Sequence, residues 1–385
     1  MLTIGNPTSS EISLYFHIPF CTKKCNYCHF YVLPDQEPLK NQLLIALKLE
    51  WKRMLPLLIN KCIISIYFGG GTPSLFSPDR IQAVLETIHQ DLPFDYSTTE
   101  ITLEVNPENG YFSLMRAYAQ AGINRVSIGI QTLDQELLHL LGRLHSPSLA
   151  KRSVLETYEA GITNLSIDLM YDLPRQSLKH WEMTLQEIGT LPLSHLSLYN
   201  LTIEPFTVFF KKQNFVRPLL PDEETSLAMY NAAIEHLTSF GLEQYEISAF
   251  AKPGFYSKHN TGYWLARPFI GFGPSAFSYW EGKRFRNVAN LKKYHQSLTL
   301  NQSPIDFNEQ LDPIAHLKEL FVIQIRLCQG ISIADFEQRH GKLSQETLET
   351  IEQFILDGFL TQSNQILSLT KKGVLFYDTV ASELI

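Results

Sequence analysis

The chain has 385 residues, of which 44% are hydrophobic and 18% are charged, so it can bury the core of a large α/β unit with an appendage or of two domains. Its formal net charge is −7, and an acidic chain gives no sign of the basic surface that binds nucleic acid. We therefore expect no nucleic-acid partner. The absence of a signal-like or membrane-spanning segment and the odd number of cysteines, five, predict a cytoplasmic protein rather than a secreted, disulfide-bonded one.

Strand-like apolar runs alternate with amphipathic helical stretches as far as about residue 200. Repeated βα units predict parallel strands joined by crossover helices, and six units are two short of a complete (β/α)8 barrel. We therefore expect an α/β fold built on an open, partial (β/α)6 barrel. The predicted strands are Leu14–Ile18, Ile63–Phe68, Ile101–Val105, Arg125–Ile130, Leu165–Met170 and Leu196–Leu201, with helices over 78–90, 113–122, 149–161 and 177–189 between them.

The pattern changes after residue 220. A helix is predicted over residues 222–241, because Asp222 lies near its start and Gly241 just after its end. A strand is expected within residues 241–250, followed by a stretch rich in aromatic residues and glycine. These features indicate an extension of the barrel.

Polar residues at 301–312 are expected to form a linker to a last, mostly helical part. A hairpin is predicted over residues 359–373, with its turn at Ser363 and Asn364. Helices followed by a hairpin predict a small winged-helix-like domain. Because the chain is acidic overall, we interpret this domain as a module that packs against the barrel or binds a partner, and not as a DNA-binding domain. The expected domains are residues 1–220, 221–300 and 301–385.

Three of the five cysteines lie close together, as Cys21-x3-Cys25-x2-Cys28. Thiolates are the usual ligands of iron–sulfur clusters, and three of them leave one iron of a [4Fe–4S] cluster open to another ligand. Three alternatives compete: c-type haem attached at the CxxCH string that ends at His29, a zinc site that uses His29 as its fourth ligand, and inert buried thiols. The tight spacing favours the cluster.

A glycine-rich turn and several polar residues stand at the ends of predicted strands. Because loops at the carboxyl ends of parallel strands build the active site in such folds, we expect these residues to meet the cysteines at one mouth. Glycines let backbone amides approach a ligand, although a tight corner also explains them, and a hydrogen bond to a neighbouring loop also explains each polar residue. The residues are the turn Gly69-Gly70-Gly71-Thr72-Pro73 and Glu104, Gln131 and Asp168.

The CxxxCxxC loop after one strand and GGGTP after the next resemble the radical S-adenosylmethionine (SAM) superfamily. The resemblance implies a [4Fe–4S] cluster on Cys21, Cys25 and Cys28, with SAM bound to the open iron. Further strings, among them YFHIPFC, SIGIQTLD and IDLMYDLP, are similar to the branch that contains the oxygen-independent coproporphyrinogen III oxidases. The residues that this resemblance assigns to SAM are Tyr15, Tyr27, Gly70, Gly71, Thr72, Glu104, Gln131, Arg143 and Asp168.

Two functions occur in this branch: oxidative decarboxylation of coproporphyrinogen III, and the binding and delivery of haem by haem chaperones. The resemblance is nearer to the chaperones, because Phe30 stands where the oxidases have a fourth cysteine and only twenty residues precede Cys21. The string His259-Asn260-x-x-Tyr263-Trp264 also matches the chaperone group. It implies haem as a third cofactor, haem-accepting respiratory proteins at the membrane as partners, and a cluster-linked homodimer, with decarboxylation as the alternative function.

His259 is then the candidate axial ligand of haem, with aromatic residues near it in the sequence to cover a porphyrin face. A surface or hydrogen-bonded histidine is the competing interpretation. Phe277 departs from the family, in which a histidine is common at that position. The two remaining cysteines, Cys62 on a strand edge and Cys328 in a helix, are expected in the core.

Overall fold

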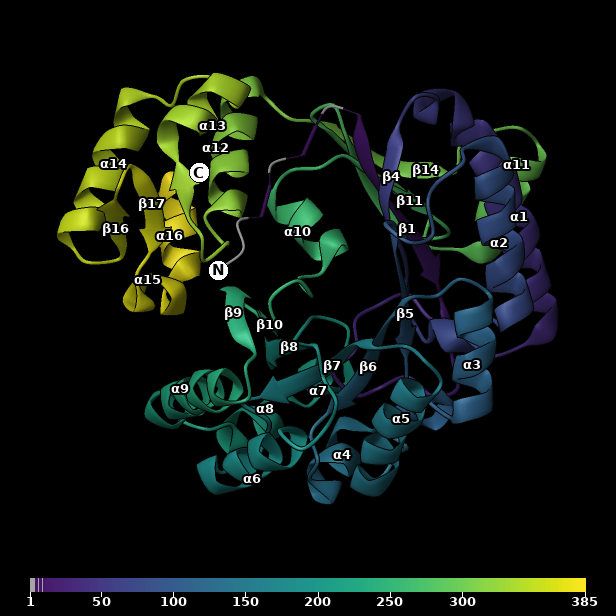
Figure 1. The fold of residues 1–385 in the computed structure, drawn as a ribbon, viewed down its shortest axis with the longest axis horizontal. Helices are drawn as coiled ribbons and strands as arrows, with labels where there is room; N and C mark the ends of the chain where they lie inside the picture. Colours follow the sequence, from purple (N-terminus) through teal and green to yellow (C-terminus); the bar gives the residue numbers. More distant parts are fainter. Residues whose placement is uncertain (1–3, 6, 9) are drawn as a thin grey trace.

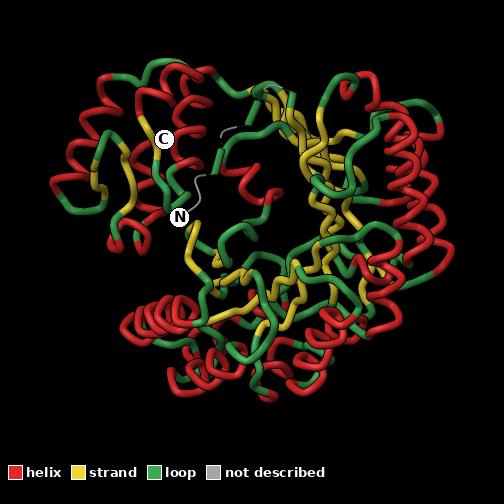
Figure 2. The backbone as a smooth tube through the Cα atoms, viewed as in Figure 1, coloured by secondary structure: helices red, strands yellow, loops and turns green. Residues whose placement is uncertain are grey.

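A computed structural model describes residues 4, 5, 7, 8 and 10–385, and its main sheet curves into an open barrel with helices outside it (Figure 1; Figure 2). The barrel strands lie side by side and run parallel, which confirms the predicted partial barrel. In sheet order they are β1 (Glu11–Ile18), β4 (Cys62–Gly70), β5 (Glu100–Val105), β6 (Arg125–Gln131), β7 (Asn164–Tyr171) and β8 (His195–Asn200).

Crossover helices cover the outer face of these strands (Figure 2). The helices are α1 (Glu37–Leu58), α2 (Pro78–Asp91), α3 (Phe112–Gln120), α4 (Gln135–Leu141), α5 (Pro147–Glu159) and α6 (Leu178–Ile188). Strand β6 is buried along its whole length, as expected for a parallel strand covered on both faces. Local signals set the helix ends: Asp134 caps the start of α4, and Gly142 ends it with a φ of 78°. Among the described residues, no helix is both long and apolar enough to cross a membrane.

The sheet continues beyond both sides of the barrel strands. Next to β8 lie antiparallel β10 (Ala249–Ala251) and β9 (Glu243–Glu246). The strand predicted within residues 241–250 is therefore a pair of short strands. On the side of β1 lie parallel β11 (Phe269–Phe272) and then antiparallel β12 (Phe277–Trp280), β13 (Lys283–Asn287) and β14 (Ile305–Gln310).

The linker predicted at residues 301–312 is wrong, because most of this segment forms β14, the edge strand of the main sheet. Its residues are largely exposed, but its first four, Ile305-Asp306-Phe307-Asn308, alternate between apolar and polar side chains, a strand signal that the linker prediction did not use. An ion pair between Arg284 of β13 and Glu309 of β14, with 2.8 Å between Nη2 and Oε2, helps to fix the strand pairing. The short alternation and the charge pairing with β13 together mark this segment as a strand.

Further α-helices follow the barrel strands in the sequence and precede the C-terminal part, which begins at Pro313. They are α7 (Val208–Lys211), α8 (Gln213–Val216), α9 (Glu223–Ser239), α10 (Lys258–Trp264) and α11 (Leu291–Thr299). Helix α9 begins as predicted after Asp222, whose carboxylate accepts a hydrogen bond from the Thr225 N–H (2.8 Å). Helix α10 lies within the arc of strands and contacts both β4 and the C-terminal helix α12 (Figure 1). The C-terminal helices are α12 (Pro313–Gln324), α13 (Ile333–His340), α14 (Gln345–Leu356), α15 (Lys371–Leu375) and α16 (Tyr377–Leu384).

The C-terminal part has a hydrophobic core of its own. A small antiparallel sheet in the order β15-β17-β16 packs with the helices, in the winged-helix-like arrangement expected from the sequence. The predicted hairpin is present, with its turn at Asn364 and Gln365, one residue later than expected. Both turn residues have positive φ angles, as two-residue hairpin turns require. The strands are β15 (Ile331–Ser332), β16 (Leu360–Ser363) and β17 (Ile366–Leu369).

The expectation that Cys62 and Cys328 are core residues is wrong. Cys62 is exposed at the first position of β4, where the strand enters the sheet. Cys328 is half-buried in a turn rather than in a helix, and its N–H donates to the carbonyl of Tyr245 (3.0 Å). Both cysteines lie at the border of an element, where apolar neighbours in the sequence do not imply burial.

A buried carboxyl group on α1 joins the helix layer to the sheet. Glu50 is 3% exposed and accepts hydrogen bonds from the Gly273 N–H (2.9 Å), the Asn287 amide (2.6 Å) and the Tyr294 hydroxyl. Burial raises the pKa of Glu50 to about 7, although the hydrogen bonds act to lower it. These contacts fix β13, α11 and the end of β11 against α1.

We expect Glu50→Ala to lower the free energy of unfolding by about 3 kcal/mol, because several buried donors lose their common acceptor. Urea unfolding followed by tryptophan fluorescence measures the change, since Trp51 is buried on the same helix. Glu86→Ala, at an exposed position of α2, is the control and should change stability by less than about 0.5 kcal/mol. Equal unfolding midpoints for the two variants would contradict the expectation.

Candidate functional site

The mouth at the carboxyl ends of the barrel strands contains a cavity of about 420 Å³, a size typical of small-molecule sites. Of the site residues predicted from the sequence, all except Tyr15 and His259 line it. A larger cavity, of about 620 Å³, lies near the amino ends of β1 and β4 and contains none of them. The predicted residues that the mouth brings together are Cys21, Cys25, Tyr27, Cys28, Gly70, Gly71, Thr72, Glu104, Gln131, Arg143 and Asp168.

The cysteine loop, residues 21–28, is fixed to two helices through Asn26. The Asn26 N–H donates to the carbonyl of Leu141 (2.9 Å), and its side-chain amide donates to that of Leu140 (2.8 Å), at the end of α4. The Asn26 carbonyl accepts from the Phe209 N–H of α7 (3.0 Å). These bonds hold the middle of the loop in place, so the three thiols keep their positions at the mouth.

The three thiols are half-buried, and burial raises the pKa of Cys21 to about 11 and also raises that of Cys28. Binding of a metal centre would therefore have to displace the protons of Cys21 and Cys28. The guanidinium of Arg143 lies beside them, with Nη1 3.6 Å from Cys25 Sγ, and can offset thiolate charge. Within the part of the chain that the structure describes, no three His, Cys, Asp or Glu side chains are grouped to hold a single metal ion.

The turn after β4 accepts only glycine at two positions. Gly70 has a φ of 115°, and a Cβ atom there would lie 2.6 Å from the His17 ring. A Cβ atom on Gly71 would lie 2.7 Å from the carbonyl oxygen of the residue before Cys21. The turn thus lies against the start of the cysteine loop, with Thr72 Oγ1 3.5 Å from Cys21 Sγ. The sequence allows two interpretations of the glycines, a tight corner or a turn that faces a ligand. In the structure one turn is both.

Two carboxyl groups deep in the barrel form the floor of the cavity. Glu104 accepts hydrogen bonds from the Gly70 N–H (3.0 Å) and the Tyr67 hydroxyl (2.8 Å), and Asp168 accepts one from the Ser127 hydroxyl (3.0 Å). Burial, and then the charge of Asp168, raise the pKa of Glu104 to about 7, and burial also raises the pKa of Asp168. A ligand that brings cationic or hydroxyl groups would stabilise both carboxylates, so the floor favours such a ligand.

Arg143 connects the wall of the cavity to the glycine turn. Its guanidinium donates to the Asn106 side-chain oxygen (2.9 Å) and to the carbonyl of Gly129. The Asn106 amide in turn donates to Thr72 Oγ1 (3.0 Å). Gln131 ends β6 with a φ of 69°, so the chain turns sharply where this side chain lines the cavity. Arg143 therefore lies between the thiols and the strand ends, within reach of both.

Tyr15 reaches the cavity only through other residues. Its hydroxyl lies 3.0 Å from His17 Nδ1, and its ring stacks on that of Tyr67 with 6.2 Å between centroids. Tyr67 is the residue that donates to Glu104. The structure therefore places Tyr15 beneath the floor and not among the residues that line the cavity.

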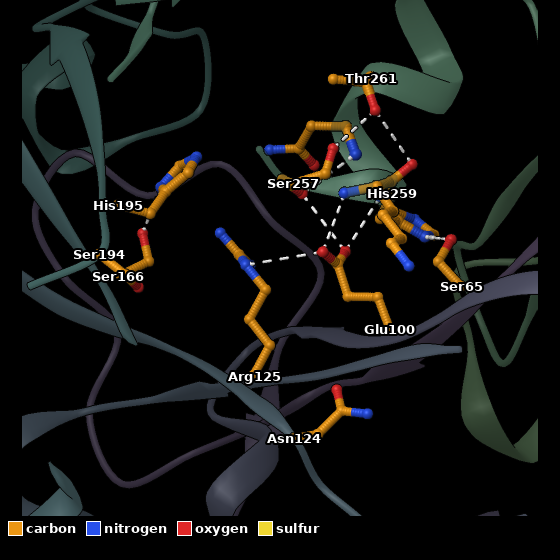
Figure 3. A network of polar contacts seen from close by, with 12 residues as sticks. Ser65, Glu100, Asn124, Arg125, Ser166, Ser194, His195, Ser257, His259 and Thr261 are labelled. Atoms are coloured by element: carbon orange, nitrogen blue, oxygen red, sulfur yellow. Dashed lines mark hydrogen bonds and ion pairs between the residues drawn. The ribbon is translucent and has the colours of Figure 1, made fainter. Parts of the chain in front are cut away.

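His259 lies on α10, within the arc of the barrel strands (Figure 1), and does not line the cavity at the mouth. Figure 3 shows its polar contacts. Its side chain is buried, Nδ1 lies 2.9 Å from the Ser65 hydroxyl, and Nε2 lies 2.8 Å from the Tyr263 hydroxyl. Its backbone N–H donates to Glu100 (3.0 Å), and burial lowers the pKa of the ring to about 3. With both ring nitrogens engaged, His259 offers none to a haem iron in this structure. The hydrogen-bonded alternative is the one observed.

The aromatic residues beside His259 connect the lumen to the C-terminal part. The Tyr263 ring meets that of Phe269 edge to face, with 4.7 Å between centroids. The guanidinium of Arg326, which follows α12, lies over the Trp264 ring at 4.3 Å. These rings are half-buried by the chain itself, each against another part of the fold.

Several residues of the cavity were missed in the sequence. Asn106 stands two residues after Glu104, and the strand residues Ser127 and Met170 face the mouth. The alternation of side chains along a parallel strand is the signal that could have found the last two. Asn26 was within the cysteine motif itself, but its contacts to α4 and α7 depend on the fold.

Comparison with known proteins gives consistent matches. Residues 15–188 match the family model described as Radical SAM superfamily, and residues 311–376 match the HemN C-terminal domain. Heme chaperone HemW of Bacillus subtilis (strain 168) is 31% identical to the chain, over 96% of the chain and 97% of its own length. Heme chaperone HemW of Escherichia coli (strain K12) is also 31% identical, with the same shares covered.

A solved structure has the same fold. Coproporphyrinogen III oxidase (HemN) from Escherichia coli, described as a radical SAM enzyme, gives a TM-score of 0.84 over 97% of this chain and 90% of its own, at 22% identity. At that identity the likeness bears on the fold alone, whereas the HemW matches extend over nearly the whole sequence. The chain belongs to the radical SAM superfamily, in the family of the HemW heme chaperones.

Proposed function

We propose that this protein is a haem chaperone that binds a [4Fe–4S] cluster and SAM at the barrel mouth and delivers haem to respiratory proteins at the membrane. The observation that carries the proposal is a single cavity lined by three cysteine thiols, a glycine turn and two carboxyl groups. The names of the HemW relatives, which match the chain at nearly full length, support the haem function. A cytoplasmic location and a cluster-linked homodimer belong to the same proposal.

Cys21, Cys25 and Cys28 would hold the cluster, since soft thiolate ligands suit iron–sulfur centres. The bound cluster supplies one-electron chemistry and one iron that no cysteine occupies. The chain's own contribution is to fix the loop through Asn26 and to offset negative charge through Arg143, whose guanidinium lies beside Cys25. The half-buried setting of the thiols also limits access of water to the centre.

SAM carries a sulfonium, an amino group, a carboxylate and ribose hydroxyls, and the cavity offers a partner of suitable charge for each polar group. The carboxyl groups of Glu104 and Asp168 suit the amino and hydroxyl groups, and Arg143 suits the carboxylate. The glycine turn exposes backbone groups at the cavity wall next to Cys21. We propose these residues, with Gln131, as the SAM contacts.

Decarboxylation of coproporphyrinogen III is the alternative function, because the fold is shared with an oxidase of that substrate. Phe30 occupies the position at which the oxidases have a fourth cysteine according to the sequence resemblance. Its side chain is 50% exposed at the rim of the cavity, so an apolar ring stands there in place of a thiol. This substitution favours haem carriage over decarboxylation.

We expect Cys21→Ala, Cys25→Ala and Cys28→Ala each to abolish the iron and acid-labile sulfide of the anaerobically reconstituted protein, because two thiolates cannot hold the cluster stably. Iron and sulfide analysis and the visible absorption spectrum measure this. Cys62→Ala is the matched control, since Cys62 is exposed and lies outside this cavity, and it should keep full cluster content. Retention of the cluster in all three loop variants would refute the site.

We expect Asp168→Asn to weaken SAM binding roughly ten- to a hundredfold, because a hydrogen bond to a charged group contributes roughly 1.5–3 kcal/mol. Calorimetry on the cluster-loaded protein measures the affinity, and iron analysis shows that the cluster is unaffected. Glu136→Gln, at an exposed position of α4, should leave the affinity unchanged. Equal SAM affinities for the two variants would remove Asp168 from the proposed site.

We expect the cluster-loaded protein to bind haem and to yield no decarboxylated product from coproporphyrinogen III over several turnovers. Anaerobic incubation with SAM, a reductant and the porphyrinogen, followed by chromatography of the oxidised porphyrins, measures the second property. Haem titration followed in the Soret region measures the first. Multiple turnovers would establish the alternative function, and failure to bind haem would remove the chaperone proposal.

A further inference from the structure

The chain has twelve histidines, and each is a possible ligand of the haem that the protein is proposed to carry. Each buried histidine has its ring in polar contacts within the fold, and the histidines other than these and His29 lie on helices and do not line the cavity at the mouth. His29 is the histidine that lines the cavity at the barrel mouth. The buried histidines are His17, His145, His195 and His259.

His29 is placed to bind something outside the chain. It directly follows Cys28, its side chain is exposed, and its ring lies 4.7 Å from that of Phe30. In the part of the chain that the structure describes, the ring nitrogens of His29 have no hydrogen-bonding partner, in contrast to those of His259. An imidazole nitrogen is a common protein ligand of haem iron.

The rim around His29 carries large aromatic side chains that are exposed. Phe30 and Tyr199, which both line the cavity, are 50% and 46% exposed, and Phe206, two residues beyond the cavity residue Glu204, is 91% exposed. The loop that carries Phe206 leads into α7, which is hydrogen-bonded to the cysteine loop through the Phe209 N–H. Large apolar side chains gathered at the mouth of a cavity indicate a ligand surface, and flat aromatic ligands suit such rings.

The same rim carries cations on the side of the cysteine loop. Lys23 and Lys24 are exposed and line the cavity, and the Lys24 ammonium donates to the carbonyl of Phe30 (2.9 Å). A porphyrin with propionate groups would present carboxylates at its edge and an apolar face, which matches lysines beside aromatic rings. The cavity itself, of about 420 Å³, is assigned to SAM, so the rim is the part of the site left for a larger planar ligand.

We infer that His29, and not His259, supplies the axial imidazole ligand of haem, which lies at the cavity mouth against Phe30 and Tyr199 with its propionates toward Lys23 and Lys24. The step is a dative bond in which the imidazole lone pair replaces a water ligand of ferric iron, with no electron transferred. The inference rests on the proposed haem function. It places the haem on the outside of the barrel, where an acceptor protein can reach it.

The test is a haem titration of cluster-loaded wild type, His29→Ala, His29→Met, His259→Gln and His180→Ala, followed by Soret difference spectra and by electron paramagnetic resonance of the ferric haem. The wild type should show an imidazole-ligated spectrum. His29→Ala should lose it and bind haem about tenfold more weakly or worse, and added imidazole should restore the spectrum. His180→Ala, at an exposed position of α6, should behave as wild type, and His259→Gln should keep the wild-type ligand spectrum.

His29→Met separates ligation from a merely structural role, because a thioether in place of an imidazole changes the spectrum of the bound haem only if residue 29 binds the iron. That comparison decides the matter even where His29→Ala holds less cluster. An unchanged ligand spectrum in both His29 variants would overturn the inference while leaving the haem function intact. Absence of haem binding by the wild type would instead remove the proposed function.

Discussion

The common direction of the barrel strands is the constraint on which the site depends. Strands that run parallel all end at the same edge of the sheet, so residues far apart in the sequence, such as Cys21, Glu104 and Asp168, line one cavity. Each of these residues occupies a strand end or the loop that follows it. Reversal of a single strand would move its contribution to the opposite mouth.

The open barrel also has a polar interior, which needs partners inside the protein. Helix α10 supplies them: the N–H groups of Lys258 and His259 donate to Glu100 (2.8 and 3.0 Å), and Arg125 lies 3.9 Å from the same carboxylate (Figure 3). The His259 ring lies 4.8 Å from that of Tyr67, which donates to Glu104 at the cavity floor. The motif that the sequence associates with haem therefore supports the floor of the site from below.

The sequence predicts the barrel strands and the mouth because both depend on local patterns: buried apolar runs, and chemically distinctive residues at their ends. It fails where the deciding partner is distant in the chain. Strand β14 alternates over only four residues, too few to separate an exposed edge strand from a loop, and the partners of the His259 ring include Ser65, which no local motif links to it. His29 is visible in the sequence beside Cys28, but its place on an exposed apolar rim follows only from the fold.

Asn26 connects the cysteine loop at the mouth to two helices outside it. Through three hydrogen bonds, this residue of the cysteine loop connects the thiols to α4 and to α7, and the loop before α7 carries the highly exposed ring of Phe206. A metal centre bound to the thiols would stiffen the loop from within, and the stiffness would pass through Asn26 to the outer surface. The cluster proposed for the thiols and the exposed ring of Phe206 would thus be connected through this one residue.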